Sequence, residues 1–185
     1  RPMADLHDAL ISLGAEISHL GEVGHLPVSV SRGSLSGGDI HIAGNVSSQF
    51  ISALMLIGPM LDSGLVVHVD GPLVSRSYVE MTADVMRSFG ASVSFDDSTI
   101  TVSSGEYGGR DYLIEPDYSS AAFPLVAIAV REGRVVIPGL ATASLQGDSE
   151  IISILENMGL TCVVIDSDVT VSRSKSQNVL PLVMD

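Results

Sequence analysis

An internal repeat constrains the fold of this 185-residue chain more than any other feature, because two stretches match at an offset of about 70 residues. Each stretch predicts the order β-α-β-α-β-β, the first over residues 39–103 and the second over residues 112–172. The expected fold class is therefore α/β (α+β), built from repeated units. The matched positions are Ser47-Ser48 with Ser119-Ser120, Gly71 with Gly139, Phe89-Gly90 with Met158-Gly159, and Asp96-Asp97 with Asp166-Ser167.

The limits of these repeats predict two lobes. A third, partial copy opens the chain, as a helix over Leu6–Leu13 followed by Gly14-Ala15. The stretch Gly105–Asp111 is glycine-rich, polar and aperiodic, which is typical of a linker. We expect residues 1–113 to form part of one lobe with one and a half repeats, and residues 114–185 to form part of a second lobe.

The second helix of the first repeat, expected over Val79–Phe89, has an amphipathic pattern. Its core face is predicted to hold Met81, Val85, Met86 and Phe89, and its outer face to hold Thr82, Asp84 and Arg87. The pair Asp96-Asp97 then lies in a hairpin turn, where Asp commonly bonds to its own backbone, so we interpret it as structural rather than as a metal or acid-base site.

Charge and composition exclude several function classes. A net charge of −13 argues against binding to nucleic acid or to a membrane surface, since both depend on clustered Lys and Arg. No apolar run reaches the ~18–20 residues of a membrane span, and we expect a cytoplasmic protein. The single cysteine, Cys162, is expected to be a small hydrophobe in a strand, and the histidines show no ligand spacing, so no metal or cofactor is expected. The chain starts at Arg1 without an initiator methionine, which suggests a piece of a longer protein.

The junction between the first strand and first helix of the first repeat, Gly44–Phe50, carries the clearest chemistry. It places Ser47, Ser48 and Gln49 at a helix start, where exposed N–H groups and the helix dipole attract phosphate or carboxylate. Serine at this position is also a common N-cap with no ligand. The residues alone leave both interpretations open.

Six segments of the chain, in order, resemble motifs of the EPSP synthase family. Ser77 and Pro116 depart from the usual family residues, but both are expected in loops, away from the binding groups. The resemblance covers nearly the whole chain and is carried by Arg1-Pro2-Met3, Gly24-His25-Leu26-Pro27, Ser47-Ser48-Gln49-Phe50 with Ser52-Ala53-Leu54, Val74-Ser75-Arg76-Ser77-Tyr78, Glu115-Pro116-Asp117-Tyr118-Ser119-Ser120-Ala121, and Ser144-Leu145-Gln146-Gly147-Asp148 with Leu155-Glu156-Asn157-Met158-Gly159.

This resemblance implies transfer of the enolpyruvyl group of phosphoenolpyruvate to the 5-hydroxyl of shikimate 3-phosphate, with release of phosphate. It implies small-molecule substrates, no cofactor, no nucleic-acid or membrane partner, and a monomeric parent enzyme whose two domains close over the substrates. Shikimate 3-phosphate is expected to contact Ser47, Ser48, Gln49 and Ser75, with Arg76 and Tyr78 near the same phosphate, and Gln49 is also expected to reach phosphoenolpyruvate.

The family's catalytic lysines, its further arginines and its catalytic aspartate are not expected within this chain. Asp185 could be taken for that aspartate, but residues 180–185 resemble the strand that precedes the family's Pro-Asp motif. We therefore expect the isolated chain to be inactive. The alternatives are the UDP-N-acetylglucosamine enolpyruvyl transferases, which lack the Ser-Ser-Gln segment, and RNA 3′-phosphate cyclases, which need a basic surface.

Overall fold

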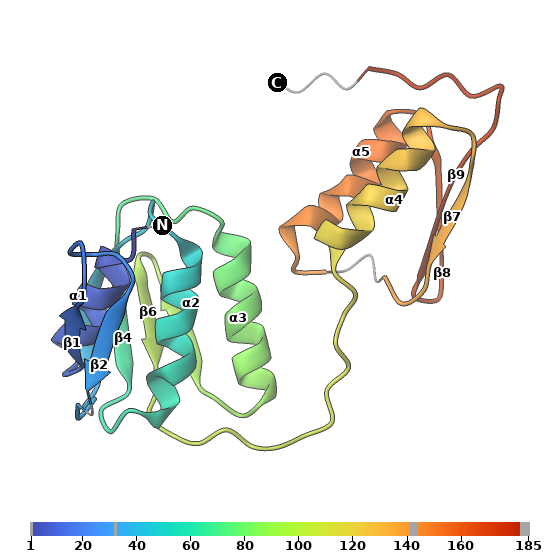
Figure 1. Ribbon diagram of the computed structural model, residues 1–185. Helices are drawn as coiled ribbons and strands as arrows, with labels where there is room; N and C mark the ends of the chain where they lie inside the picture. Colours follow the sequence, from blue (N-terminus) through green and yellow to red (C-terminus); the bar gives the residue numbers. More distant parts are fainter. Residues whose placement is uncertain (1, 32, 141–143, 182–185) are drawn as a thin grey trace. The chain divides into compact units, whose positions relative to one another are not determined.

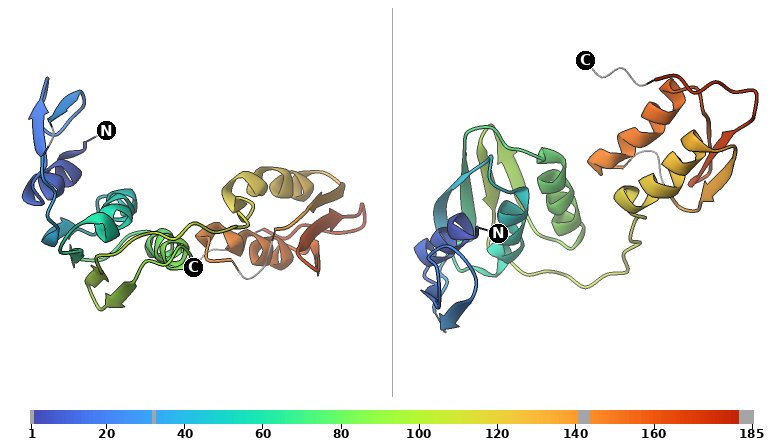
Figure 2. Two further views of the ribbon diagram at one scale, coloured as in Figure 1. Left: turned by 90° about the horizontal axis from the view of Figure 1, so that it is seen from below. Right: turned by 45° about the horizontal axis from the view of Figure 1, so that its top comes forward.

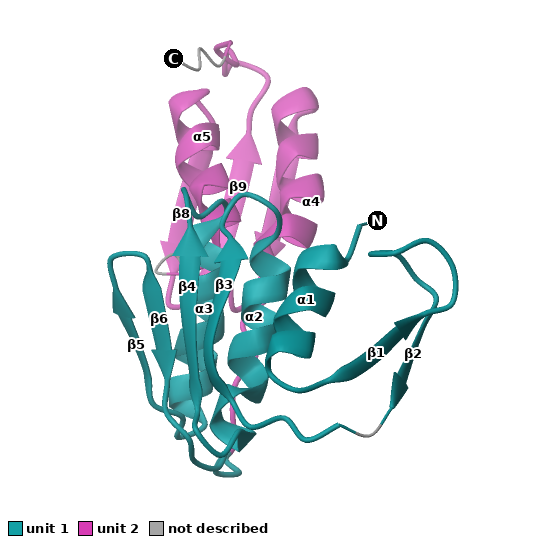
Figure 3. Ribbon diagram, turned by 90° about the vertical axis from the view of Figure 1, so that its left-hand side faces the viewer, with its two compact units in different colours: residues 1–110 teal, residues 111–185 magenta. Residues whose placement is uncertain are grey.

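The computed structural model describes residues 2–31, 33–140 and 144–181, and it divides into two compact units. Unit 1 comprises Arg1–Arg110 and unit 2 comprises Asp111–Asp185, drawn in different colours in Figure 3. Each unit has its own cluster of buried apolar side chains. In the described part of the chain, no helix is long and apolar enough to cross a membrane.

Unit 1 contains a four-stranded sheet with two helices on one face (Figures 1 and 3). The sheet order is β3-β4-β6-β5, with β3 and β4 parallel and the other pairs antiparallel. The predicted order of elements, β-α-β-α-β-β, is confirmed for this repeat. Its elements are β3 (Gly38–Ala43), α2 (Ser48–Ile57) extended by the 3-10 turn η1 (Gly58–Met60), β4 (Leu65–Asp70), α3 (Arg76–Ser88), β5 (Val93–Asp96) and β6 (Thr99–Val102).

Alternation along the strands of unit 1 decides which face the helices cover. Ile40, Ile42, Val67 and Val69 are buried, whereas the residues between them are more exposed, as expected for strands with one covered face. Helix α3 adds Met86 to this core, as predicted. The prediction for the rest of α3 is partly wrong, and Ser77, expected in a loop, lies in the first turn of this helix. Met81 and Thr82 are both half-buried, and both face a groove between α2 and α3.

The partial copy at the start of the chain is an α-β-β segment. The predicted helix is present as α1 (Ala4–Ser12), and it is followed by the antiparallel hairpin of β1 (Glu16–His19) and β2 (Val28–Ser31). The buried His7 of α1 and His19 of β1 lie 3.2 Å apart between Nδ1 and Nε2, so one imidazole donates a hydrogen bond to the other and ties the helix to the hairpin.

Unit 2 has a three-stranded antiparallel sheet, in the order β7-β9-β8, with two helices on one face (Figure 2). Its elements are α4 (Tyr118–Val130), β7 (Gly133–Ile137), the 3-10 turn η2 (Gly147–Glu150), α5 (Ile151–Asn157), β8 (Thr161–Ile165) and β9 (Asp168–Arg173). Cys162 lies in β8 as expected, and burial raises the pKa of its thiol to about 11, with a smaller contribution from Glu156.

The strand expected at the start of the second repeat, over Tyr112–Glu115, is not present, so that part of the prediction is wrong. Leu113 is 94% exposed and Ile114 is 82% exposed, and neither residue is in a strand. Two neighbouring apolar residues of a strand point to opposite faces. A strand here therefore needs cover on both sides, and the described residues of unit 2 provide none.

The expected linker, Gly105–Asp111, is attached to unit 1 along most of its length. Gly105 N–H donates to the carbonyl of Pro59 at 2.8 Å, and Gly108 N–H donates to the carbonyl of Phe89 at 2.7 Å. Tyr107 Oη donates to the carbonyl of Leu56 at 2.9 Å. The boundary between the two units accordingly falls near the end of this segment, between Arg110 and Asp111.

Candidate anion-binding site

Two loops of unit 1 meet at one edge of the sheet because β3 and β4 are parallel and end together. Loops that follow the carboxyl ends of parallel strands are a common place for ligands. Gly44 joins the two loops, since its N–H donates to the Asp70 carbonyl at 2.9 Å and its carbonyl accepts from Val74 N–H at 3.0 Å. A Cβ on Gly44 would lie 2.8 Å from the Pro72 carbonyl oxygen, so only glycine fits this contact.

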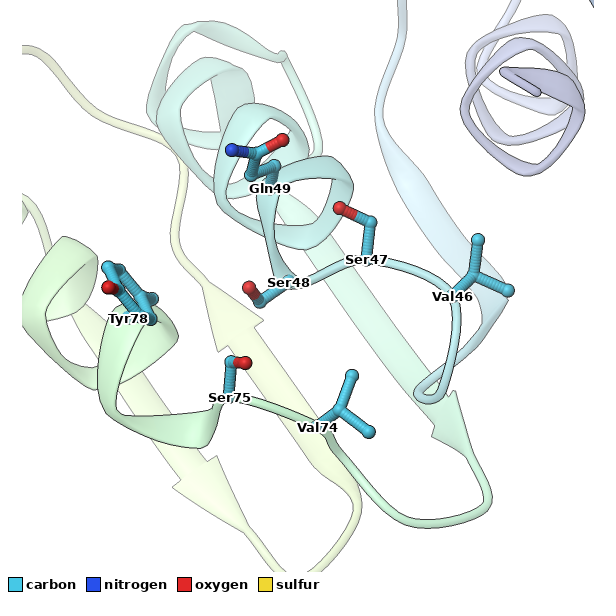
Figure 4. Close-up of a pocket in the computed structure, with 7 residues that line it drawn as sticks. All are labelled: Val46, Ser47, Ser48, Gln49, Val74, Ser75 and Tyr78. Carbon is cyan, nitrogen blue, oxygen red and sulfur yellow. The ribbon is translucent and has the colours of Figure 1, made fainter. Parts of the chain in front are cut away.

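A cavity of about 320 Å³ opens between these loops (Figure 4). The side chains of Ser48 and Ser75 lie at the starts of the two facing helices, and Tyr78 stands on the side of α3. None of the lining residues carries a formal charge, so any attraction for an anion comes from backbone and side-chain dipoles. The cavity is lined by Val46, Ser47, Ser48, Gln49, Val74, Ser75 and Tyr78.

Two helices begin at this cavity, α2 after the N-cap Ser47 and α3 after the N-cap Ser75. Within the described part of the chain, neither N-cap side chain forms a capping hydrogen bond. The positive ends of both helix dipoles therefore lie at the same cavity. The N-cap hydroxyl groups do not bond to the N–H groups of their own helices. Ser47 and Ser48 are each only 9% exposed, and both line the cavity.

Ser75 has an unusual backbone conformation. Its φ of 53° and ψ of 45° place it in the left-handed region, which costs a residue with a Cβ roughly 1–2 kcal/mol. This conformation turns the chain from the loop into α3 and leaves the Ser75 side chain on the cavity wall. Strained residues of this kind occur most often at functional sites.

Five of the six residues expected to bind shikimate 3-phosphate lie together around the cavity: Ser47, Ser48, Gln49, Ser75 and Tyr78. Arg76 does not lie with them. Its Nε donates to Glu80 Oε1 at 2.7 Å, and its side chain lines a different cavity beside Phe95 and Asp97. The cation expected at the phosphate is therefore paired elsewhere in this structure.

Sequence reasoning missed a second feature of the site, a groove of about 260 Å³ between α2 and α3. The groove shares Ser48, Gln49 and Tyr78 with the cavity and continues along Ser52, Ala53, Leu56, Met81 and Thr82. Ser52 Oγ and Thr82 Oγ1 lie 2.9 Å apart across it. The spacing of four residues from Ser48 to Ser52, and from Tyr78 to Thr82, was the signal that could have placed them on these walls.

The first helix of unit 2 begins differently. The N-cap of α4 is Asp117, whose carboxylate accepts from the N–H groups of Ser119 and Ser120 at 3.1 Å each. These bonds, led by the one from the Ser120 hydroxyl, lower the pKa of Asp117. Ser119 and Ser120 lie inside α4, whereas Ser47 precedes α2, so the serine pairs matched by sequence are not structurally equivalent.

Two further side chains close the start of α4. Gln146 Oε1 accepts from Tyr118 N–H at 2.8 Å, and its Nε2 donates to the Pro116 carbonyl at 2.9 Å. The Ser119 hydroxyl donates to the Asp148 carboxylate. Asp185, weighed above as a catalytic aspartate, lies outside the described residues, as does Arg1.

Comparison with known proteins gives a consistent result. A family model described as EPSP synthase (3-phosphoshikimate 1-carboxyvinyltransferase) matches residues 1–184. The 3-phosphoshikimate 1-carboxyvinyltransferase of Serratia proteamaculans is 36% identical over 182 residues, which cover 97% of this chain and 42% of that protein. The protein of the same name from Methanothermobacter thermautotrophicus is 43% identical over 159 residues, covering 86% of this chain and 38% of that protein.

Solved structures agree. An EPSP synthase structure from Acinetobacter baumannii matches with a TM-score of 0.69 and 27% identity, covering 93% of this chain and 40% of that one. The enolpyruvyl transferase NikO from Streptomyces tendae matches with a TM-score of 0.63 at 18% identity, covering 95% of this chain and 43% of that one, which shows a shared fold alone. The chain spans about two fifths of the length of the relatives that it matches.

Proposed function

Because this chain belongs to the EPSP synthase family, we propose that it is part of an enzyme that transfers the enolpyruvyl group of phosphoenolpyruvate to the 5-hydroxyl of shikimate 3-phosphate, releasing phosphate. The observation that carries this proposal is the cavity where two helices begin without side-chain caps. Such a site supplies hydrogen-bond donors and positive dipole ends without a net charge, which suits a phosphate monoester.

In this proposal the chain provides the binding wall for shikimate 3-phosphate. Ser47, Ser48 and Ser75 donate hydrogen bonds from their hydroxyl groups, and Tyr78 closes the side of the cavity on α3. Gln49, at the mouth of both the cavity and the groove, is placed to contact shikimate 3-phosphate and phosphoenolpyruvate at once. Holding both reactants by one amide favours reaction by fixing their relative orientation.

Arg76 joins this wall only after a change of partner. Its guanidinium pairs with Glu80 in an exposed i,i+4 ion pair, which is a weak interaction of about 0.3–0.5 kcal/mol. A phosphate dianion competes well with a single exposed carboxylate, because guanidinium and phosphate form charge-assisted bidentate bonds. We propose that Arg76 leaves Glu80 and turns toward the phosphate when the ligand binds.

The chain alone is not expected to catalyse the reaction. Its net charge is −13, and the cavity is lined by uncharged residues, whereas stabilising the charge that develops on phosphoenolpyruvate needs fixed cations. We expect no phosphate release above background when the purified chain is given both substrates. Release that is lost in Gln49→Ala would contradict this expectation.

The test of the proposal is Ser48→Ala in the complete enzyme that contains this chain. Losing one hydrogen bond to a charged ligand costs about 1.5–3 kcal/mol, so the KM for shikimate 3-phosphate should rise roughly 10- to 100-fold. The KM for phosphoenolpyruvate should rise less. The matched control is Ser120→Ala, at the position paired with Ser48 by sequence but capped by Asp117. Equal KM values for Ser48→Ala and wild type would refute the assignment.

We also propose that the two units belong to different lobes, which close over the substrates. Their separate apolar clusters and the exposed Leu113 and Ile114 support this arrangement. Because Gly105–Arg110 is bonded to unit 1, brief chymotrypsin treatment should cut at Tyr112 or Leu113 rather than in the glycine-rich stretch. Cleavage confined to residues 105–109 would place the hinge there instead.

The complete enzyme is proposed to act in the cytoplasm as a monomer on these two small molecules. The excess of 22 acidic residues over 9 Lys and Arg in this chain supports a protein without a nucleic-acid partner, because such binding depends on clustered positive charge. Sedimentation of the complete enzyme, and fractionation of cells that produce it, test these two points directly.

A further inference from the structure

We propose that Ser52 and Thr82 form a positioning pair that keeps the two halves of the substrate site in register, an inference that rests on the proposed function. One half of the site is on α2, which carries Ser48, and the other half is on α3, which carries Tyr78. Ser52 follows Ser48 by four residues, and Thr82 follows Tyr78 by four. Each member of the pair thus lies one turn along its helix from a site residue.

The hydrogen bonds of Thr82 determine which of the two hydroxyl groups is the donor between Ser52 and Thr82. Thr82 Oγ1 donates to the carbonyl of Tyr78 at 2.8 Å. A hydroxyl has only one hydrogen to donate, so the 2.9 Å contact between Ser52 and Thr82 has Ser52 Oγ as its donor. A continuous chain therefore runs from α2, through the Thr82 hydroxyl, to the backbone of Tyr78.

This chain of bonds lies in the wall of the groove that continues from the cavity. Ser52 and Thr82 are both half-buried, and they line the groove together with Leu56, Met81 and the shared residues Ser48 and Tyr78. Apolar packing holds α2 and α3 together but is non-directional. A short, directed hydrogen bond across the groove opposes sliding of one helix along the other, which packing alone allows.

The start of α3 has few side-chain bonds of its own. Its N-cap, Ser75, is in the left-handed region and does not cap the helix, and the Arg76–Glu80 pair of the first turn is exposed. The backbone bond between the two loops at Gly44 and the burial of Val79 hold this turn, and the positioning pair adds a directed link to α2 one turn further along. If α3 slides, Ser75 and Tyr78 move away from Ser48, and the phosphorylated substrate loses its contacts on one side.

The experiment is Thr82→Val in the complete enzyme, because valine keeps the shape of threonine and removes its hydroxyl. We expect the KM for shikimate 3-phosphate to rise about three- to tenfold, the effect of one neutral hydrogen bond on ligand placement. The KM for phosphoenolpyruvate should change less. Thr82→Ser, which keeps the hydroxyl, should restore the wild-type KM. The matched control is Thr101→Val, which removes a half-buried threonine hydroxyl from the other face of the sheet.

A double-mutant cycle separates positioning from general stability. Ser52→Ala removes the donor and leaves the Thr82–Tyr78 bond in place, so it also serves if Thr82→Val fails to fold. When the two residues act as one link, Ser52→Ala combined with Thr82→Val raises the KM no further than Thr82→Val alone. If the fold-increases in KM of the two single variants multiply in the double variant, the two residues act separately and the pairing is wrong. A KM that follows the melting temperature across all variants would show a general structural role and would also overturn the pairing.

Two outcomes distinguish this inference from the proposed function. A raised KM in Ser48→Ala together with a wild-type KM in Thr82→Val and Ser52→Ala refutes the positioning pair and leaves the function standing. Wild-type KM values for shikimate 3-phosphate in Ser48→Ala and Ser75→Ala refute the proposed function, and the positioning pair falls with it.

Discussion

The first helices of the two repeats, α2 in unit 1 and α4 in unit 2, begin in opposite ways. In unit 1, the N-cap of α2 is Ser47, which makes no capping bond, and the next helix begins with the small Ser75 across an open cavity. In unit 2, the N-cap of α4 is Asp117, whose carboxylate occupies the helix start. Gln146, the N-cap of η2, also accepts a hydrogen bond from the Tyr118 N–H at this helix start.

This difference shows how a repeat can keep a fold and change its role. A helix start needs acceptors for its first N–H groups, and it takes them from its own side chains, from water or from a ligand. Unit 2 uses an internal carboxylate and gains stability. In the proposed site, unit 1 leaves those groups to a bound anion, which would give up some stability of the unliganded protein in exchange for binding.

The largest effect is expected when the N-cap of α2 is changed to the residue type that caps α4, by Ser47→Asp. A carboxylate and a phosphate about 4 Å apart repel by about 4 kcal/mol at the surface of a protein. The KM for shikimate 3-phosphate in the complete enzyme should therefore rise a hundredfold or more, on the order of what that energy implies. The unliganded chain should melt at a higher temperature, because Asp caps a helix well.

The control for that change is Ser47→Asn, which has the same shape and capping ability without the charge. It should raise the melting temperature and increase the KM far less than Ser47→Asp. A similar KM for the two variants would mean that bulk, rather than charge, excludes the substrate.

The second prediction compares the two glutamines that lie at these helix starts, Gln146 in unit 2 and Gln49 in unit 1. Gln146→Ala leaves the Tyr118 N–H and the Pro116 carbonyl without their partner, which should cost about 1–3 kcal/mol of unfolding free energy. Gln49 is exposed, so Gln49→Ala should change unfolding in urea much less while weakening substrate binding. Equal destabilisation by the two changes would contradict the division between a structural and a binding amide.

The third prediction concerns Asp117 and the pH dependence of thermal stability. Its pKa is lowered from 3.8 by the bonds from Ser120 and Ser119, so the ionised carboxylate stabilises the folded state. That contribution is present above pH 3.8 and is lost as the pH falls through the lowered pKa of the folded state. Asp117→Ala should melt at a lower temperature than wild type at neutral pH. The two melting curves should converge in acid, and a constant difference at every pH would exclude the charged cap as the cause.

A feature of the fold or the site could be predicted from the sequence when it is determined by residues that lie close together along the chain. The elements of unit 1 and the gathering of five site residues followed from strand alternation, helix starts and family motifs that lie within a few residues of one another. The strand at Tyr112–Glu115 was mispredicted because pairing depends on cover from distant parts of a protein, which local pattern does not contain.

Two other features depend on side-chain conformation or on the packing of one helix against another. Arg76 was expected at the phosphate, but the choice between Glu80 and a ligand depends on side-chain conformation rather than on position in the sequence. Thr82 was assigned to the outer face of α3, because the helical pattern distinguishes core from solvent and says nothing about a second helix alongside. The link from Ser52 to Thr82 needed the packing of α2 against α3 to be known.

The smallest predicted effect concerns the backbone of Ser75 and distinguishes strain from chemistry at the open helix start. Ser75→Gly relieves the left-handed conformation and should stabilise the unliganded chain by about 1 kcal/mol, whereas Ser75→Ala keeps the strain and should not. Both changes remove the hydroxyl, so both should raise the KM for shikimate 3-phosphate by a similar factor. If binding needs the strained backbone of Ser75 and not its hydroxyl, Ser75→Ala should bind as wild type does and Ser75→Gly should not. Urea unfolding of the chain and KM values of the complete enzyme, measured on both variants, separate these cases because the two substitutions differ in strain and share the loss of the hydroxyl.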